Sequence, residues 1–260
     1  MSDVGRISEL WTYPVKSFQG GRVGSLAVQT AGVDGDRRWA LIDVASGRLL
    51  SAKRRKELLE ATVADDGENI VLPTGEVVDL ADLEAASAAC SAWLGADVEM
   101  RAVGGDEPLT FEMTFDPPND DAEMFEIPVP VGTFLDWAPI HLVHQATLDG
   151  CATARPDLDW SMRRFRPNVV LDGPLNAPFD EQGWVGCQLR LGADLVLNVQ
   201  QPTVRCAMPL RAQPDGINRE PEIFSALNDL NTASPNHLGL YLQVAEPGTV
   251  SVGDGVTLLS

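Results

Sequence analysis

A cysteine between two prolines has the clearest chemical potential in this sequence. Cys206 follows Arg205 in the run Gln201-Pro202-Thr203-Val204-Arg205-Cys206-Ala207-Met208-Pro209. Proline removes a backbone donor and fixes φ, so the segment between Pro202 and Pro209 is expected to leave a sheet as a constrained loop. A neighbouring guanidinium favours the thiolate, which is the reactive and metal-binding form. The pattern predicts that Cys206 is a nucleophile or a soft-metal ligand; the alternative is a small buried hydrophobe, as most free cysteines are.

Two of the other three cysteines are expected to be structural, and Cys151, beside Gly150 in an expected loop, is left unassigned. Cys90, Cys151 and Cys187 have no Cys-x-x-Cys spacing, which excludes the simplest zinc-ribbon and iron–sulfur frameworks. Cys90 lies on the apolar stripe of an expected helix, and Cys187 alternates with Leu189 and Leu191, so both are expected in the core. The N-terminus lacks a basic segment followed by an apolar core, so we expect no signal peptide and free thiols rather than disulfides.

Basic residues are scarce and gather in few places. The 260 residues include 38 acidic and 19 basic ones, with a formal net charge of −19. This balance argues against a nucleic-acid surface, which needs a basic footprint. The only lysines are Lys16, Lys53 and Lys56, and arginines cluster at 37–38 and 163–166. For any one arginine, the alternative to a binding role is an ion pair with one of the many carboxylates.

Two histidines do not form an obvious metal site. His141 and His144 are three residues apart in an expected strand, which places them on opposite faces. A shared metal is therefore disfavoured, and both are expected to be structural or surface histidines.

Short strand-like runs at intervals of about ten residues predict a mainly β (α+β) fold, a barrel or sandwich rather than βαβ units. Strands are expected near residues 4–13, 23–28, 38–43, 139–144, 165–173, 184–191, 195–199, 238–244 and 250–258. One helix is expected to start with Asp79 as N-cap and to stop at Gly95. Further helices are expected from residue 146 and over 222–230.

An acidic stretch separates the two halves of the chain. Residues 105–126 carry eight carboxylates, no basic residue and the pair Pro117-Pro118, which is typical of an inter-domain connection. A calcium loop is the alternative, but the EF-hand spacing is absent, so a solvated loop is favoured. No apolar run approaches the roughly 20 residues of a spanning helix. We therefore expect a cytoplasmic protein without a membrane or nucleic-acid partner. No P-loop, dinucleotide fingerprint or G-x-S-x-G elbow is present.

Five short motifs follow one another along the chain: 13–17 (Tyr-Pro-Val-Lys-Ser), 35–39 (Gly-Asp-Arg-Arg-Trp), 164–168 (Arg-Phe-Arg-Pro-Asn), the Arg205-Cys206 loop, and 246–254 (Glu-Pro-Gly-Thr-Val-Ser-Val-Gly-Asp). Together they resemble two-part MOSC proteins, the family of the mitochondrial amidoxime-reducing component and bacterial YcbX-like proteins. The resemblance covers nearly the whole chain. It implies a small N-terminal β-barrel domain over residues 1–115 and a MOSC β-barrel domain with a few helices over residues 116–260.

The resemblance also implies a molybdenum cofactor (Mo-molybdopterin) bound between the two domains. In the family, the cysteine matching Cys206 is the protein ligand of molybdenum, and a thiolate suits a metal already held by a dithiolene. The other family contacts map onto Lys16, Ser17, Arg37, Asp136, Trp137, Arg166, Asn168, Arg205 and Tyr241. Forked guanidinium donors, an ammonium and neutral hydrogen-bonding groups suit a phosphate and a pterin.

Two functions follow from this resemblance. The first is a molybdenum-dependent oxidoreductase that reduces N-hydroxylated small molecules with electrons from a separate donor protein. The alternative is a sulfur-handling or cofactor-carrier protein, in which Cys206 bears a persulfide or holds the cofactor for delivery.

Overall fold

The computed structural model describes residues 1–64, 67–105 and 107–259. The strands are β1 (Ser2–Thr12), β2 (Gly21–Val23), β3 (Ser25–Gln29), β4 (Gly32–Val33), β5 (Trp39–Asp43), β6 (Thr62–Val63), β7 (Asn69–Val71), β8 (Val77–Asp79), β9 (Val98–Ala102), β10 (Thr110–Met113), β11 (Phe125–Pro128), β12 (Ile140–His144), β13 (Val169–Asp172), β14 (Gln188–Leu191), β15 (Leu195–Val204), β16 (His237–Glu246), β17 (Gly248–Ser251) and β18 (Gly255–Leu259). The helices are α1 (Leu83–Leu94), α2 (Gln145–Ala154), α3 (Met162–Phe165) and α4 (Glu222–Leu230), with 3-10 turns η1 (Lys56–Glu60), η2 (Asp180–Trp184) and η3 (Met208–Leu210). The expected mainly β fold is confirmed.

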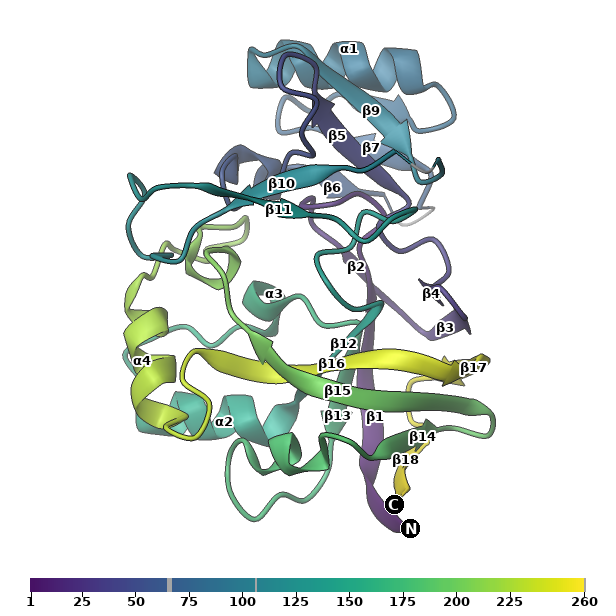
Figure 1. Cartoon of the computed structure of the whole chain (residues 1–260), viewed down its shortest axis with the longest axis vertical. Helices are drawn as coiled ribbons and strands as arrows, with labels where there is room; N and C mark the ends of the chain where they lie inside the picture. Colours follow the sequence, from purple (N-terminus) through teal and green to yellow (C-terminus); the bar gives the residue numbers. More distant parts are fainter. Residues whose placement is uncertain (65–66, 106, 260) are drawn as a thin grey trace.

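A closed barrel forms one half of the molecule. Its strands follow the order β13-β12-β16-β15-β14-β18-β1, and β1 closes the ring by pairing with β13. Only the β12–β13 pair of this ring is parallel, and a parallel pair needs a crossover, which α2 and α3 provide. Alternating aliphatic side chains from these strands fill the interior. Figure 1 shows the two chain ends close together at the lower edge of the barrel.

The N-terminal and C-terminal strands of the chain belong to the same sheet. Strand β1 pairs with β18 as well as β13, and β3 pairs with β17. Their apolar residues, such as Ile7 and Leu26, lie in the barrel core. The expected division of the chain between residues 115 and 116 stays a prediction.

The remaining N-terminal residues form small sheets, β5–β9 and β6–β7–β8, packed with α1 at the end of the molecule far from the termini (Figure 1). Helix α1 buries Ala86 and Cys90, so the core position of Cys90 is confirmed. It ends at Gly95 in the left-handed conformation (φ 60°), as expected. The expected N-cap at Asp79 is wrong: Asp82 caps the helix, with its Oδ1 accepting from Ala85 N at 3.0 Å, because Asp79 still belongs to β8.

The prediction that the acidic stretch is a solvated loop is wrong. It contains β10 and reaches into β11, and the two strands pair with one another as a hairpin. Asp120, between them, forms ion pairs with Arg211 and Arg219. The hairpin loop is therefore bound to the segment that follows Cys206 rather than being only solvated. Asp106 lies outside the described residues.

The loop that carries Cys206 starts later than predicted. Strand β15 runs through Pro202 to Val204, and the register against β16 shifts between Val199 and Gln201 and again between Pro202 and Val204. Such bulges leave residues unpaired and so accommodate a proline that cannot donate to the ladder. The loop begins at Arg205.

Two other expected strands are shorter in the structure. Residues 162–165 form α3, so the strand of this motif starts only at Val169. Residues 180–184 form η2, and β14 starts at Gln188. Cys187 therefore precedes the strand and is only half-buried, against the core position predicted for it. Among the described residues, no helix is long and apolar enough to cross a membrane.

Candidate functional site

A cavity lies where the barrel meets the N-terminal sheets. Its walls come from the turn after β1, the segment between β11 and β12, the residues joining α3 to β13, and the loop after β15. All ten residues predicted for the site line it: Lys16, Ser17, Arg37, Asp136, Trp137, Arg166, Asn168, Arg205, Cys206 and Tyr241. The structure thus brings together residues that are up to 225 positions apart, from 16 to 241.

Cys206 is held at the end of β15 by a reciprocal pair of hydrogen bonds one residue before it. Arg205 N donates to Asn236 O at 2.8 Å, and Asn236 Nδ2 donates to Arg205 O at 2.6 Å. The following 3-10 turn contains Pro209 and is buried. Cys206 itself is half-buried and lines the cavity.

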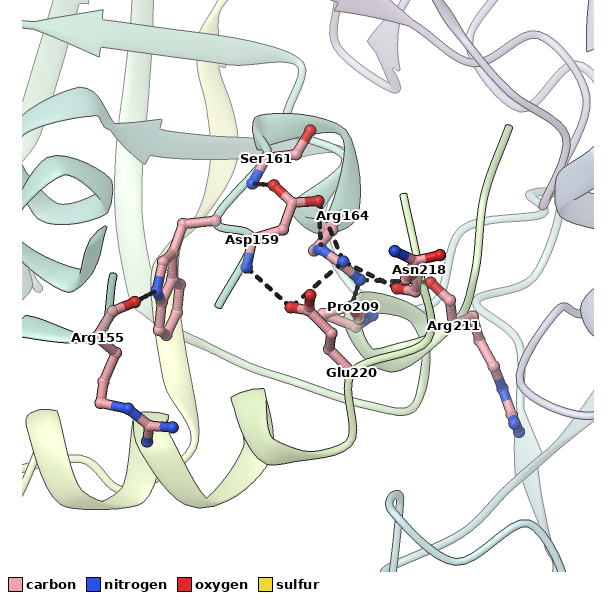
Figure 2. Close-up of polar contacts among 9 residues, drawn as sticks. Arg155, Asp159, Ser161, Arg164, Pro209, Arg211, Asn218 and Glu220 are labelled. Carbon is pink, nitrogen blue, oxygen red and sulfur yellow. Dashed lines mark hydrogen bonds and ion pairs between the residues drawn. The ribbon is translucent and has the colours of Figure 1, made fainter. Parts of the chain in front are cut away.

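A buried arginine fixes the segment after Cys206 (Figure 2). The Arg164 side chain is fully buried, and its guanidinium donates to the carbonyl of Pro209 at 3.0 Å and to that of Asn218 at 2.9 Å. The same guanidinium binds the carboxylates of Asp159, at 3.1 Å, and Glu220, at 3.4 Å. Arg164 therefore ties α3 to the loop that carries the cysteine, while Arg166 faces the cavity.

His141 connects three predicted site residues. Its backbone N–H donates to Asn168 Oδ1 at 3.2 Å, and its Nε2 lies 3.3 Å from Arg205 Nη1. Its Nδ1 lies 3.4 Å from Arg166 O, so a neutral ring protonated at Nδ1 satisfies both neighbours. Burial, reinforced by the charge of Arg205, holds the pKa of His141 well below its usual value. Only 7% of His141 is exposed, so of the two alternatives predicted for it, structural or surface, the structural one holds.

Three site residues have an unusual backbone conformation. Ser17, Arg37 and Arg166 have φ angles of 68°, 48° and 54°, and they are three of the six described non-glycine residues with positive φ. This region is sparsely populated by side-chain-bearing residues, and such strain clusters at functional sites. The conformation turns the three side chains into the cavity at the cost of local strain.

Two arginines of the cavity pack against one tyrosine. The Tyr13 ring contacts Arg37 at 4.6 Å and Arg166 at 4.2 Å, measured from the guanidinium carbon to the ring centroid. Arg37 forms an ion pair with Asp36. Arg166 has no carboxylate partner among the described residues, and burial lowers its pKa to about 10. Tyr13 is itself buried, which raises its pKa.

An ion triad closes the other side of the cavity. Lys16 Nζ donates to Asp136 Oδ1 at 2.5 Å, and Lys53 Nζ donates to Asp136 Oδ2 at 2.8 Å. Burial lowers the pKa of Lys16 to about 8, although Asp136 opposes this shift. Burial alone would raise the pKa of Asp136, but the two ammonium groups hold it well below its usual range.

Sequence reasoning missed three polar residues of the cavity: Ser51, Lys53 and His141. One sequence feature could have pointed to Lys53, because it is one of only three lysines in an acidic chain. No sequence feature pointed to Ser51. Both reach the cavity because the chain turns back toward Ser17, whose Oγ accepts from Ala52 N at 3.0 Å.

The donors of the cavity fit a polar, anionic ligand. The side-chain atoms Ser51 Oγ, Arg166 Nη1 and Arg205 Nε are buried without a hydrogen-bond partner in the part of the chain that the structure describes. Leaving such groups unpaired costs free energy, so a ligand rich in acceptor oxygens would stabilise the site. A phosphate and a pterin supply such acceptors, and the Cys206 thiol offers a soft ligand to a metal.

Comparisons with known proteins identify similar sequences over the whole chain. The model of the MOSC N-terminal β-barrel domain matches residues 4–101, and the MOSC domain model matches residues 131–257. Human mitochondrial amidoxime-reducing component 1 is 25% identical over 293 residues, covering 100% of this chain and 84% of the relative. Rat mitochondrial amidoxime reducing component 2 is 25% identical over 295 residues, covering 98% and 84%. The solved structure of the YUAD protein from Bacillus subtilis covers 98% of this chain and 96% of its own, with 12% identity and a TM-score of 0.48.

Proposed function

This chain belongs to the MOSC proteins that carry a MOSC N-terminal β-barrel domain, and on that premise we propose that it is a molybdenum-cofactor-dependent oxidoreductase. We infer that it reduces small N-hydroxylated compounds such as amidoximes, because its relatives are named for that reduction. The observation that carries the proposal is the convergence of Cys206 with a set of buried, partly unpaired cationic donors on one cavity.

The cysteine and the cationic residues of the cavity would have different tasks. The Cys206 thiolate would hold the metal. Arg37 and Arg166 would bind the phosphate group of the cofactor with forked donors, and Lys16 would add a point charge. The strained turns at Ser17, Arg37 and Arg166 pre-organise these donors, so little is lost in ordering them when the ligand binds.

The remaining contacts would hold the pterin and the substrate. Ser17 and Asn168 offer neutral hydrogen bonds, while His141 keeps Arg205 in place through its neutral ring. Trp137 and Tyr241 also line the cavity, and Trp137 is 63% exposed at the surface. We place the substrate entrance beside Trp137, where an amphipathic ring meets solvent.

The bound cofactor would supply the two-electron chemistry. Reducing an amidoxime to an amidine breaks the N–O bond, takes up two electrons and two protons, and releases water. At neutral pH, Lys16 Nζ keeps its proton, since its pKa is about 8, and shares it with Asp136 Oδ1. The Lys16 ammonium can therefore donate a proton inside the cavity, while Asp136, which stays ionised, holds that ammonium in place.

We propose that a separate donor protein supplies the electrons, because the names of the relatives describe each of them as one component of an amidoxime-reducing system. The sequence contains no dinucleotide fingerprint through which the chain could take electrons from NADH itself. A cytoplasmic location stays a prediction from the sequence; the named relatives are mitochondrial.

Reduction of an amidoxime with reduced viologen tests the proposed activity. Protein loaded with molybdenum should turn over benzamidoxime with viologen and not with NADH alone. Cys206→Ala should abolish turnover, and Cys90→Ala, which changes only the core of α1, should keep it in whatever protein folds. Loaded wild-type protein that is inactive with viologen would shift the assignment to the carrier function.

A further inference from the structure

The β10–β11 hairpin carries an aromatic pair that the described part of the chain leaves largely uncovered. Of the eight phenylalanines, all of which the structure describes, Phe115 and Phe125 are the two exposed ones, at 71% and 38%. Their ring centroids lie 5.1 Å apart, so the two rings form one apolar patch. Single exposed apolar residues are common on protein surfaces, whereas contiguous ones with polar neighbours are typical of an interaction surface.

The patch continues a buried row of side chains out to the surface. Phe111 pairs with Ile127 across the hairpin, and Met113 pairs with Phe125. Phe111 is buried in a hydrophobic cluster of the N-terminal sheets, and Met113 and Ile127 are partly buried against that cluster. Alternate residues of a strand lie on the same face, so this apolar face runs from the cluster to solvent. Its outer end has no partner within the described residues.

The charge beside the patch indicates what kind of protein would cover it. Asp116, Asp121 and Glu123 are exposed near the two rings in the sequence, and none of them forms an ion pair within the described residues. Unpaired charge of one sign attracts a partner of the opposite sign and steers its approach. A second copy of this chain has the same net charge of −19 and would be repelled. The complementary partner is therefore a protein with a basic face.

The hairpin is joined to the loop of the metal ligand by a buried arginine. Arg211, in the segment that follows Cys206, forms an ion pair with Asp120 between the two strands of the hairpin. Its Nη2 also donates to the backbone oxygen of Lys53, a residue of the cavity wall, at 2.9 Å. Figure 1 shows the hairpin between the N-terminal sheets and the barrel. A protein bound at the hairpin would thus lie close to the segment that carries Cys206.

We propose that Phe115, Phe125 and the neighbouring carboxylates form the docking surface for the electron-donor protein, which binds through a basic face. The aromatic pair would form the buried centre of the contact, and the carboxylates its charged rim. The donor would be oxidised by two electrons in each turnover, and cleavage of the N–O bond would consume them. That the partner is an electron donor rests on the proposed function, whereas the surface rests on the exposed rings and the unpaired charge.

Electron delivery by a protein, compared with delivery by viologen, tests this surface. The donor source is a cell extract of the organism that encodes the chain, supplied with NADH, and the benzamidoxime reduction of the extract alone is subtracted. Phe115→Ser combined with Phe125→Ser should lower the extract-driven turnover of cofactor-loaded protein at least about tenfold, because it removes the apolar centre of the contact. Viologen-driven turnover should stay unchanged, since a small dye reaches the cavity without docking.

A matched control separates docking from a general loss of surface hydrophobicity. Val77 in β8 is 62% exposed, and Val77→Ser should leave both kinds of turnover unchanged. Equal extract-driven turnover in the wild type and the double phenylalanine variant would overturn the proposal. A loss of viologen-driven turnover in that variant would overturn it as well, because the two rings would then serve the fold or the site.

The carboxylates are tested separately by the dependence of turnover on salt. Asp116→Asn, Asp121→Asn and Glu123→Gln together should slow extract-driven turnover at low ionic strength and weaken its dependence on salt. The control removes three exposed carboxylates elsewhere on the surface, with the changes Asp97→Asn, Asp194→Asn and Glu246→Gln. An equal effect of the two triple variants would contradict the assigned docking surface.

The same assays separate this proposal from the proposed function. Turnover with viologen but none with the extract would overturn the docking proposal and leave the oxidoreductase function intact. Absence of turnover with viologen in loaded wild-type protein would contradict the proposed function, and with it the assignment of the partner as an electron donor.

Discussion

Arg166 combines three features that are unfavourable in the ligand-free protein. It has positive φ, its guanidinium is buried with one unpaired nitrogen, and Arg37 repels it. A residue with these features is explained by ligand binding rather than by stability. Arg166→Asn keeps a residue that tolerates this backbone conformation and removes the buried charge.

We therefore expect a trade between stability and binding at this position. Ligand-free Arg166→Asn protein should be at least as stable as the wild type in urea denaturation, while its cofactor content falls. Arg166→Lys keeps the charge but loses the fork and should also retain less cofactor. A clear loss of stability in Arg166→Asn would show that the guanidinium serves the fold.

Single residues of the site could be predicted where a motif carried them. Lys16, Arg37, Arg166 and Cys206 each lie in a short segment whose residue types suit the chemistry, and all line the cavity. Lys53 could not be assigned from sequence, because its role depends on Asp136, a partner distant in the chain.

At the scale of elements, α3 presents two adjacent arginines with opposite environments. Arg164 is fully buried and donates to backbone carbonyls of the segment after Cys206. Arg163 is 25% exposed, and it pairs with Asp215, which is 80% exposed. Arg164→Met should lower the free energy of unfolding by at least about 2 kcal/mol, because it leaves buried carbonyls unpaired.

Arg163→Met is the matched control in the same helix. Its ion pair with the exposed Asp215 contributes little, but Arg163 Nη2 also donates to Gln19 Oε1 at 3.2 Å, so this variant should lower stability by only about 1 kcal/mol. Urea denaturation of both variants measures the difference. Equal effects on stability would contradict the structural role that we assign to Arg164.

The junction of α2 and η2 contains a buried acid that predicts a pH dependence. Glu181 is fully buried, its Oε2 accepts from Thr147 Oγ1 at 2.8 Å, and burial raises its pKa to about 7. The folded state thus keeps a proton that the unfolded state releases near pH 4.5. Glu181 therefore stabilises the fold fully below pH 4.5, and this contribution is lost as the pH rises through about 7.

Comparison with Glu181→Gln isolates this effect. Relative to that variant, the wild type should lose roughly 3 kcal/mol of unfolding free energy between about pH 4.5 and about pH 8. His144 acts in the opposite direction, because burial lowers its pKa to about 4 and its contribution is lost as the pH falls from about 6.5. Its effect is common to both proteins and cancels. A pH-independent difference would show that Glu181 is ionised in the fold.

Elements with a strong local pattern could be predicted, and α4 has the expected bounds of 222–230. Errors arose where tertiary contacts override the local pattern. The bulged pairing with β16 carries β15 through Pro202, and Asp120 binds arginines that no local pattern connects to it.

At the scale of the whole molecule, the barrel closes through a strand pairing that no local sequence pattern predicts. Strand β1 joins β13 across more than half of the chain, and this brings the turn with Lys16 and Ser17 next to Arg166 and Asn168. The resemblance to a family predicted the site because it already contained this long-range arrangement. Composition and periodicity predicted a β-rich protein with a few helices, but not which residues meet at the cavity.

The molybdenum and pterin content of purified protein tests the central claim most directly. Protein from a host that makes the cofactor should contain about one molybdenum per chain, since one Cys206 lines one cavity. Cys206→Ala should lose the metal, and Cys90→Ala should retain it in the folded fraction. Wild-type protein that contains no molybdenum, together with a persulfide on Cys206 in its mass spectrum, would contradict the account and support a sulfur-handling protein.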